Sequence, residues 1–122
     1  MKILLIEDEK LIALLIRKIL EKKGHEVTVC GSVEEAEKGQ QDEKNDFVVC
    51  DLMLPGKPGS DFVKDVRQKK NNIPILILSA VSTTSTKTEL LNLGANDYMT
   101  KPFEPAELTA KIEEIYQKAR PS

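Results

Sequence analysis

The stretch FVVCDLMLPGKPG, residues 47–59, joins an apolar run to a carboxylate and a turn. Residues 47–50 are all apolar, which is typical of a strand buried on both faces of a parallel sheet. Asp51 follows at once, and the Pro and Gly residues between positions 55 and 59 turn the chain away. The stretch therefore predicts a central strand that ends on a charged group at the edge of a sheet.

Further apolar runs of similar length recur along the chain. They lie at residues 3–6, 27–30, 75–78 and, more weakly, 97–99. The runs at 3–6 and 75–78 are continuously apolar like 47–50, whereas EVTVC at 26–30 alternates as a strand at a sheet edge does. The sequence thus predicts five strands, three of them central.

The segments between these runs carry helix signals. Ser32 and Glu35 form a capping box that opens the second helix, and Gly24 and Gly94 end the first and fourth helices. Pro105 opens the last helix. Helical spacing predicts inward faces for the first and last helices, made of Ile12, Leu15, Ile16, Ile19, Leu108, Ile112, Ile115 and Ala119.

Strand and helix alternate five times, which predicts an α/β fold with a doubly wound parallel sheet of five strands and helices on both faces. The flavodoxin-like strand order 2-1-3-4-5 fits, because it places the alternating second strand at an edge. The chain of 122 residues has the size of one domain. We expect residues 1–119 to form that domain and residues 120–122 to be a C-terminal tail or the start of a linker.

Charge and composition narrow the classes of function. Lys and Arg number 18 against 20 Asp and Glu, and the basic residues form no dense patch, so we expect no nucleic-acid binding by this domain alone. The apolar stretches are too short to cross a bilayer and the start shows no signal-peptide pattern, which favours a cytoplasmic protein without membrane contact. Cys30, Cys50 and His25 are too few for a zinc site or a disulfide framework.

The residues that follow the strands carry the chemistry. Glu7 and Asp8 follow the first strand, and Asp51 follows the third. Ser79 and Lys101 come after the fourth and fifth. The carboxyl ends of parallel strands meet at one edge of the sheet, where open α/β folds bind their ligands. Each residue alone has a structural explanation, such as capping of the first helix by Asp8, but together they predict a site.

Three carboxylates in one place repel each other and need a compensating group. Mg²⁺ prefers oxygen ligands and commonly shares carboxylates with a substrate phosphate, whereas protonation is the alternative. The nearby ammonium and hydroxyl favour the metal, because such a set neutralises phosphoryl oxygens during transfer. Asp51 is then the expected nucleophile that forms an aspartyl phosphate.

These residues resemble the receiver domain of response regulators in two-component signal transduction systems, over essentially the whole chain. The matching motifs are ILLIEDE (3–9), CDLMLPGKPG (50–59), LSA (78–80) and GANDYMTKPF (94–103). The resemblance implies that the domain is a phosphoacceptor signalling switch, a regulatory phosphoprotein that promotes its own phosphorylation and slow dephosphorylation, and not an enzyme.

The resemblance also implies roles for individual residues. Asp51 would take a phosphoryl group from the phosphohistidine of a sensor histidine kinase or a phosphotransfer protein, and Ser79 and Lys101 would contact that group. The Lys101–Pro102 bond would be cis. The groups that would hold Mg²⁺ are the side chains of Glu7, Asp8 and Asp51 and the carbonyl of Met53. Glu7 stands where many members carry Asp, so the side chain at this position is longer here.

Tyr98 matches the family's switch aromatic, which turns inward when Ser79 moves toward the phosphate. The resemblance implies that phosphorylation shifts the surface of the fourth helix, fifth strand and fifth helix to control an output protein, an effector domain not in this chain, or a homodimer. Asn92 departs from the Glu usual in winged-helix transcriptional regulators. The charged positions that those regulators use to dimerise correspond to Lys87, Asp97 and Lys111.

Three other readings remain open. A haloacid-dehalogenase phosphatase would carry DxD after the first strand, where residues 7–9 read Glu-Asp-Glu. A flavin-binding module would need a glycine- and hydroxyl-rich phosphate loop at that position. A degenerate receiver, which binds partners independently of phosphorylation, would lack Asp51, the acidic pair or Lys101.

Met53 and Val81 border the path of water to the acyl phosphate in this family. Met53 stands two residues after the acceptor Asp51, and Val81 stands two residues after the hydroxyl residue Ser79. Neither side chain orients a water molecule by a hydrogen bond. We therefore hypothesise that self-dephosphorylation is slow.

Overall fold

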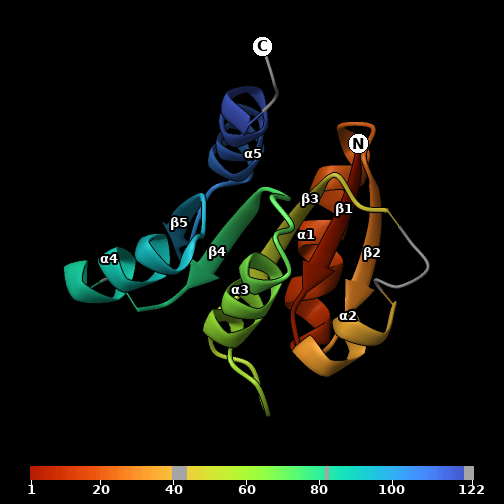
Figure 1. Cartoon of the computed structure of the whole chain (residues 1–122). Helices are drawn as coiled ribbons and strands as arrows, with labels where there is room; N and C mark the ends of the chain where they lie inside the picture. Colours follow the sequence, from red (N-terminus) through yellow and green to blue (C-terminus); the bar gives the residue numbers. More distant parts are fainter. Residues whose placement is uncertain (40–43, 82, 120–122) are drawn as a thin grey trace.

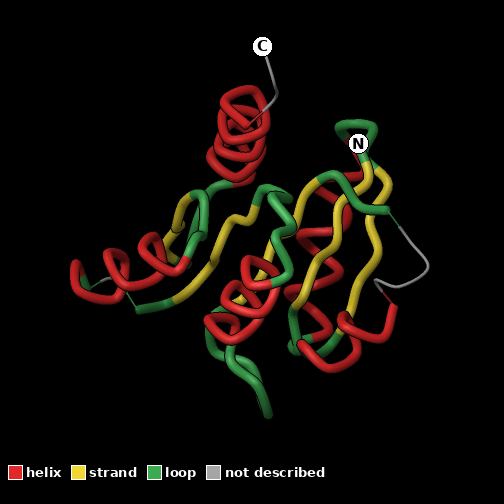
Figure 2. The backbone as a smooth tube through the Cα atoms, viewed as in Figure 1, coloured by secondary structure: helices red, strands yellow, loops and turns green. Residues whose placement is uncertain are grey.

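The computed structural model describes residues 1–39, 44–81 and 83–119, so the expected tail at 120–122 lies outside the described residues. Its strands form one parallel sheet in the order β2-β1-β3-β4-β5, which confirms the predicted order. Helices alternate with strands along the chain and cover both faces of the sheet (Figure 1 and Figure 2). The elements are β1 (Lys2–Ile6), α1 (Lys10–Lys22), β2 (Glu26–Cys30), α2 (Val33–Gly39), β3 (Phe47–Asp51), α3 (Gly59–Gln68), β4 (Ile75–Ser79), α4 (Thr84–Leu93), β5 (Asp97–Thr100) and α5 (Pro105–Ala119).

The strand side chains pack into two apolar layers, one on each face of the sheet. Ile3 and Leu5 of β1 join the layer that contains α1 and α5, whereas Leu4 and Ile6 join the layer that contains α2, α3 and α4. β3 and β4 are buried along their whole length, as expected for central strands of a parallel sheet. Because both faces are covered, polar groups reach solvent mainly at the ends of the strands.

Two residues that were predicted to face inward lie on the surface. Leu15 of α1 is 57% exposed, and the buried side chains of that helix are Ala13, Ile16 and Leu20. α1 carries aliphatic residues on nearly every side, so apolar spacing alone did not identify the face that packs. Ala119, the last residue of α5, is also exposed, one turn beyond the buried Ile115.

The predicted helix ends are present. The hydroxyl of Ser32 accepts a hydrogen bond from the amide of Glu35 at 3.1 Å, and the Glu35 carboxylate accepts one from the amide of Gly31 at 2.8 Å. This reciprocal capping satisfies backbone donors that the first turn of α2 leaves unpaired.

The turn between α4 and β5 fits only glycine at position 94. Gly94 has a φ of 119°, which L residues rarely adopt. A Cβ atom at this position would lie 2.6 Å from Cγ of Arg67. Arg67 extends from α3 across the turn, where it donates to the carbonyl of Gly94 at 2.9 Å and to Oδ1 of Asn96 at 3.0 Å. The C-terminal end of α4 is thereby tied to α3.

Replacing Gly94 with Ala is expected to lower the free energy of unfolding by about 1–2 kcal/mol, because the new Cβ is strained by its φ and meets Arg67. Gly39→Ala is the matched control, since a Cβ there has no atom within 4 Å and its φ is outside the strained region. Urea denaturation of both variants tests the prediction. Equal stabilities would show that the Gly94 turn adapts to a side chain.

Candidate functional site

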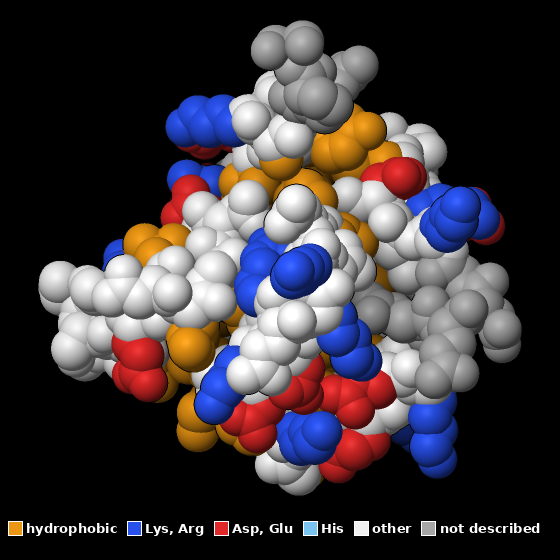
Figure 3. Space-filling view, in the orientation of Figure 1, with side chains coloured by type: hydrophobic (Ala, Val, Ile, Leu, Met, Phe, Trp, Pro, Cys, Tyr) orange, Lys and Arg blue, Asp and Glu red, His pale blue; other side chains and the backbone are white. Residues whose placement is uncertain are grey.

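The predicted site residues that follow the strands lie at the carboxyl edge of the sheet. Glu7 follows β1 and Asp51 ends β3. Ser79 ends β4 and Lys101 follows β5. The register brings these ends level, since Asp51 pairs with Leu78, the residue before Ser79. In Figure 3, acidic side chains gather near the lower edge of the view, toward which the strand arrows of Figure 1 point.

Three carboxylates form a compact cluster at this edge. One oxygen atom each from Glu7, Asp8 and Asp51 lies within 4.8 Å of the other two. Glu7 is 2% exposed and Asp51 is 8% exposed, whereas Asp8 reaches solvent. Asp8 does not cap α1, because Glu9 occupies the cap position and no side chain bonds there. The capping explanation of Asp8 is therefore wrong, and the cluster remains as a set of oxygen donors.

Lys101 bridges two of these carboxylates. Its Nζ donates to Oε1 of Glu7 at 2.8 Å and to Oδ2 of Asp51 at 3.3 Å. Its amide donates to the carbonyl of Ser79 at 2.8 Å, and the Lys101–Pro102 bond is cis, as the resemblance implied. Burial lowers the pKa of Lys101, but its bonds to Glu7 and Asp51 outweigh burial and raise that pKa overall.

Three carboxylates face one ammonium in the cluster, so negative charge is in excess. Burial, together with the neighbouring Asp51 carboxylate, raises the pKa of Glu7 to about 7, although Lys101 acts in the opposite direction. Oε2 of Glu7 is buried without a hydrogen-bond partner among the described residues. A proton or a cation would relieve this charge. The oxygen-only donor set, with one buried oxygen still unpaired, fits Mg²⁺.

Ser79 and Tyr98 are buried in the neighbouring strands β4 and β5. Ser79 is buried, and its Oγ accepts the amide of Val81 at 3.0 Å. Tyr98 is turned into the protein, and its hydroxyl has no hydrogen-bond partner in the part of the chain that the structure describes. Nζ of Lys87 lies 5.6 Å from the centroid of the Tyr98 ring, within the range of a cation–π contact. A residue of α4 therefore contacts the aromatic side chain of β5.

The other predicted residues are placed as follows. Met53 is exposed in the loop after β3, two residues from Asp51. Lys111 of α5 forms an ion pair with Asp97 of β5 at 3.0 Å. Sequence reasoning paired Lys101 with a phosphoryl group and missed its bond to Glu7. No sequence signal identifies that bond, because it depends on how far the longer Glu side chain extends.

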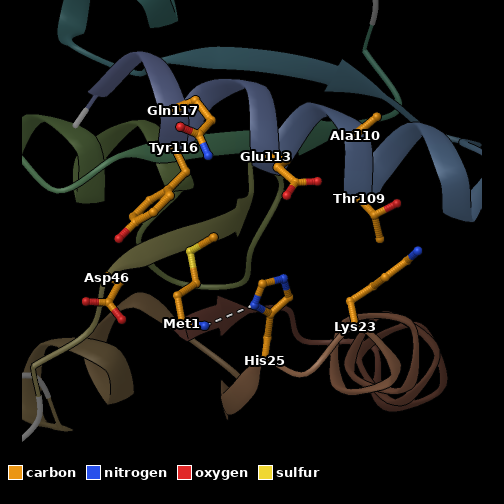
Figure 4. Close-up of a pocket in the computed structure, with 9 residues that line it drawn as sticks. All are labelled: Met1, Lys23, His25, Asp46, Thr109, Ala110, Glu113, Tyr116 and Gln117. Carbon is orange, nitrogen blue, oxygen red and sulfur yellow. Dashed lines mark hydrogen bonds between the residues drawn. The ribbon is translucent and has the colours of Figure 1, made fainter. Parts of the chain in front are cut away.

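Two clefts border the sheet at opposite ends. A cleft of about 380 Å³ opens beside Glu7 and Asp8, next to α1. A larger cleft of about 560 Å³ lies at the amino end of the strands, where the α-amino group of Met1 donates to Nδ1 of His25 at 3.1 Å (Figure 4). Its lining residues are Met1, Lys23, His25, Asp46, Thr109, Ala110, Glu113, Tyr116 and Gln117. None of these is a predicted site residue, so cleft size does not identify the site.

Comparisons with known proteins agree with this geometry. Residues 3–113 match the response regulator receiver domain family. The alkaline phosphatase synthesis transcriptional regulatory protein PhoP of Bacillus subtilis is 42% identical over 118 residues, which cover 97% of this chain and 49% of that protein. The phosphate regulon transcriptional regulatory protein PhoB of Rhizobium meliloti is 35% identical over 122 residues, with 98% and 54% covered. The chain thus spans about half the length of these curated relatives.

Solved structures give the same result. The receiver domain of the Francisella response regulator 1452 has a TM-score of 0.91 and 34% identity, and the match covers 98% of both chains. The BeF3-activated N-terminal receiver domain of Klebsiella pneumoniae RstA has a TM-score of 0.89 and 32% identity, over 96% of this chain and 99% of that one.

Among the helices of the described segments, none has the length and apolar character that a membrane span requires.

The raised pKa of Glu7 predicts a pH-dependent stability. Glu7 titrates near 4.5 when unfolded and near 7 when folded, so the folded state binds more protons between these values. The stabilisation that Glu7 contributes is complete below the unfolded pKa and is lost as the pH rises through about 7. We compare the free energy of unfolding of the wild type with that of Glu7→Gln in the presence of a chelator. The wild-type value minus the variant value should fall by roughly 1–3 kcal/mol between about pH 5 and pH 8.

Urea denaturation at a series of pH values measures this difference. Glu9→Gln, the same substitution at an exposed neighbour, controls for the loss of one charge. A difference between wild type and Glu7→Gln that stays constant with pH would contradict the raised pKa.

Proposed function

Because this chain belongs to the response regulator receiver domain family of two-component systems, we propose that it is a cytoplasmic phosphoacceptor switch whose acceptor is Asp51, with residues 1–119 as the receiver domain. The observation that carries the proposal is the setting of Asp51. Its carboxylate ends a buried central strand, lies within 4.8 Å of two other carboxylates, and accepts a hydrogen bond from Lys101. A rigid strand end holds a nucleophile in place, and the adjacent ammonium is positioned for the charge of an incoming phosphoryl group.

In the proposed reaction, an oxygen of Asp51 bonds to the phosphorus of a phosphohistidine, on a sensor histidine kinase or a phosphotransfer protein. The phosphorus–nitrogen bond breaks, and its electron pair leaves with the imidazole. Lys101 would pair with one oxygen of the transferred group, and the hydroxyl of Ser79 would donate to another. Both groups therefore stabilise the negative charge that Asp51 acquires.

A divalent cation completes the proposed site. The side chains of Glu7, Asp8 and Asp51 and the carbonyl of Met53 would hold Mg²⁺. When bound, Mg²⁺ would neutralise phosphoryl oxygens during transfer. The unpaired buried oxygen of Glu7 and the excess carboxylate charge support this assignment.

In the proposed output, phosphorylation changes which conformation of the surface formed by α4, β5 and α5 is most populated. If Ser79 turns toward the phosphoryl group, its hydroxyl gives up the bond to the Val81 amide, at the start of the connection to α4. Lys87, Asp97 and Lys111 lie on these elements, and Lys87 contacts the switch aromatic Tyr98. The partner of this surface would be an output protein, an effector domain or a second copy of the chain.

The lengths and names of the relatives indicate one kind of partner for this surface. They are named transcriptional regulatory proteins, and about half their length lies outside the match. An effector domain is therefore one kind of output that the proposal includes.

Phosphorylation of Asp51 tests the proposal directly. With Mg²⁺ and acetyl phosphate, we expect the intact mass of the protein to rise by one phosphoryl group, because a small donor needs no kinase and requires only Asp51, its charged neighbours and Mg²⁺. Asp51→Asn should gain none, and a chelator should prevent the gain in the wild type. Asp61→Asn, at an exposed carboxylate of α3, is the matched control and should behave as the wild type. No gain by a folded wild type would instead indicate a phosphorylation-independent binding module.

The lifetime of the phosphoryl group is a second test. Met53→Asn introduces a hydrogen-bonding group at the exposed position two residues after the acceptor, where it orients a water molecule for hydrolysis. After removal of the donor, we expect the aspartyl phosphate of this variant to decay roughly fivefold faster, which corresponds to one hydrogen bond of ~1 kcal/mol. Intact mass over time gives the rate, and an unchanged rate would rule out control by this position.

A further inference from the structure

The five sulfur-containing residues of this chain differ sharply in exposure, and the exposed one is next to Asp51. Met53 is 67% exposed. Cys30 and Cys50 are buried in the apolar layer that contains α2 and α3, whereas Met1 and Met99 are partly buried and pack against the opposite layer. Burial also raises the pKa of the Cys50 thiol, which keeps it from forming the reactive thiolate. Among the sulfur-containing residues, Met53 is therefore the most open to an oxidant in solution.

The residue before Met53 is fixed beside the acceptor by two backbone hydrogen bonds. The amide of Leu52 donates to the carbonyl of Leu78 in the neighbouring strand at 2.9 Å. The amide of Gly59 donates to the carbonyl of Leu52 at 3.0 Å, where a Cβ on Gly59 would overlap the backbone of Asp51. The Met53 side chain is thus exposed on a loop that is anchored next to Asp51. A chemical change on its sulfur occurs beside the site and not on a distant surface.

We propose that Met53 is a methionine oxidation site whose sulfoxide shortens the lifetime of the phosphoryl group on Asp51. The proposal rests on the proposed function for its second half. The co-reactant is a peroxide such as hydrogen peroxide. The sulfur lone pair attacks one peroxide oxygen, a sulfur–oxygen bond forms, the oxygen–oxygen bond breaks, and water leaves after proton transfer. Sulfur is oxidised by two electrons and the peroxide is reduced by two.

The chemistry of the sulfoxide gives the direction of the effect. A thioether is a weak hydrogen-bond acceptor, whereas oxidation makes the side chain polar and adds an oxygen that accepts hydrogen bonds. Hydrolysis of an acyl phosphate needs a water molecule held in line with the bond that breaks. Met53 and Val81, which border that path in this family as the resemblance implies, offer no strong hydrogen-bonding group to hold it. The sulfoxide oxygen supplies an acceptor at that position, and the expected increase in the decay rate is about fivefold, the factor for one hydrogen bond.

The first measurement concerns oxidation alone. The protein is treated with dilute hydrogen peroxide, digested, and the methionine peptides are quantified by mass spectrometry over time. Met53 is expected to gain an oxygen before Met1 and Met99. Equal rates at the three methionines would overturn the assignment of the site. This measurement needs no phosphorylation, so its result is independent of the proposed function.

The second measurement concerns lifetime. Oxidised and untreated proteins are phosphorylated with acetyl phosphate and Mg²⁺, the donor is removed, and intact mass follows the decay. Decay should be about fivefold faster after oxidation, and methionine sulfoxide reductase should restore the slow rate. Met53→Leu, which keeps an apolar side chain of similar size, should show no effect of peroxide. Met53→Gln, which carries an acceptor without oxidation, should decay faster in untreated protein.

The outcomes separate the two parts of the proposal. Selective oxidation of Met53 with an unchanged decay rate would overturn the effect on lifetime. A peroxide effect that persists in Met53→Leu would place the responsible residue elsewhere and overturn the role of Met53. If neither oxidised nor untreated protein accepts a phosphoryl group, the proposed function fails and the lifetime effect fails with it, while the oxidation result still stands.

Discussion

The excess negative charge at the carboxyl edge of the sheet is the constraint on which the rest of the site depends. Parallel strands end at the same edge, so the chain cannot separate Glu7 from Asp51 without changing the fold. The apolar layers on both faces limit hydration of these carboxylates, which raises the pKa of Glu7 and draws Lys101 to both of them. The same burial that stabilises the sheet therefore creates a site with affinity for positive charge.

The backbone connects this charged edge of the sheet to α4. Lys101 is held by the carbonyl of Ser79, so the lysine and the hydroxyl belong to one hydrogen-bonded pair of strand ends. After Ser79 the chain continues to α4. The one buried side chain of that helix is Leu90, near its C-terminal end. Arg67 fixes that end through Gly94. The first turns of α4 thus have few tertiary contacts, and segments of this kind change conformation at low free-energy cost.

Much of this arrangement could be predicted from the sequence because it follows from strand ends. Once the run before Asp51 is recognised as a central strand, the parallel order places Glu7 and Lys101 at the same edge, as the structure confirms. Contacts between side chains could not be predicted in the same way. Leu15 was assigned to the wrong face of α1 because aliphatic residues surround that helix. The contact of Lys87 with Tyr98 depends on how α4 lies against β5, and apolar spacing contains no information about that.

The length of the Glu7 side chain explains why Lys101 is shared and not committed to Asp51. Glu is one methylene longer than Asp, and the Glu7 carboxylate reaches the ammonium of Lys101 at 2.8 Å, closer than the 3.3 Å of the Asp51 carboxylate. Glu7 also keeps one oxygen unpaired, so it has capacity for a second positive partner. In the proposed site, a cation on that oxygen would weaken the attraction between Glu7 and Lys101. The ammonium would then be available to the group proposed on Asp51, so in the proposed function the longer side chain would couple cation binding to the position of Lys101.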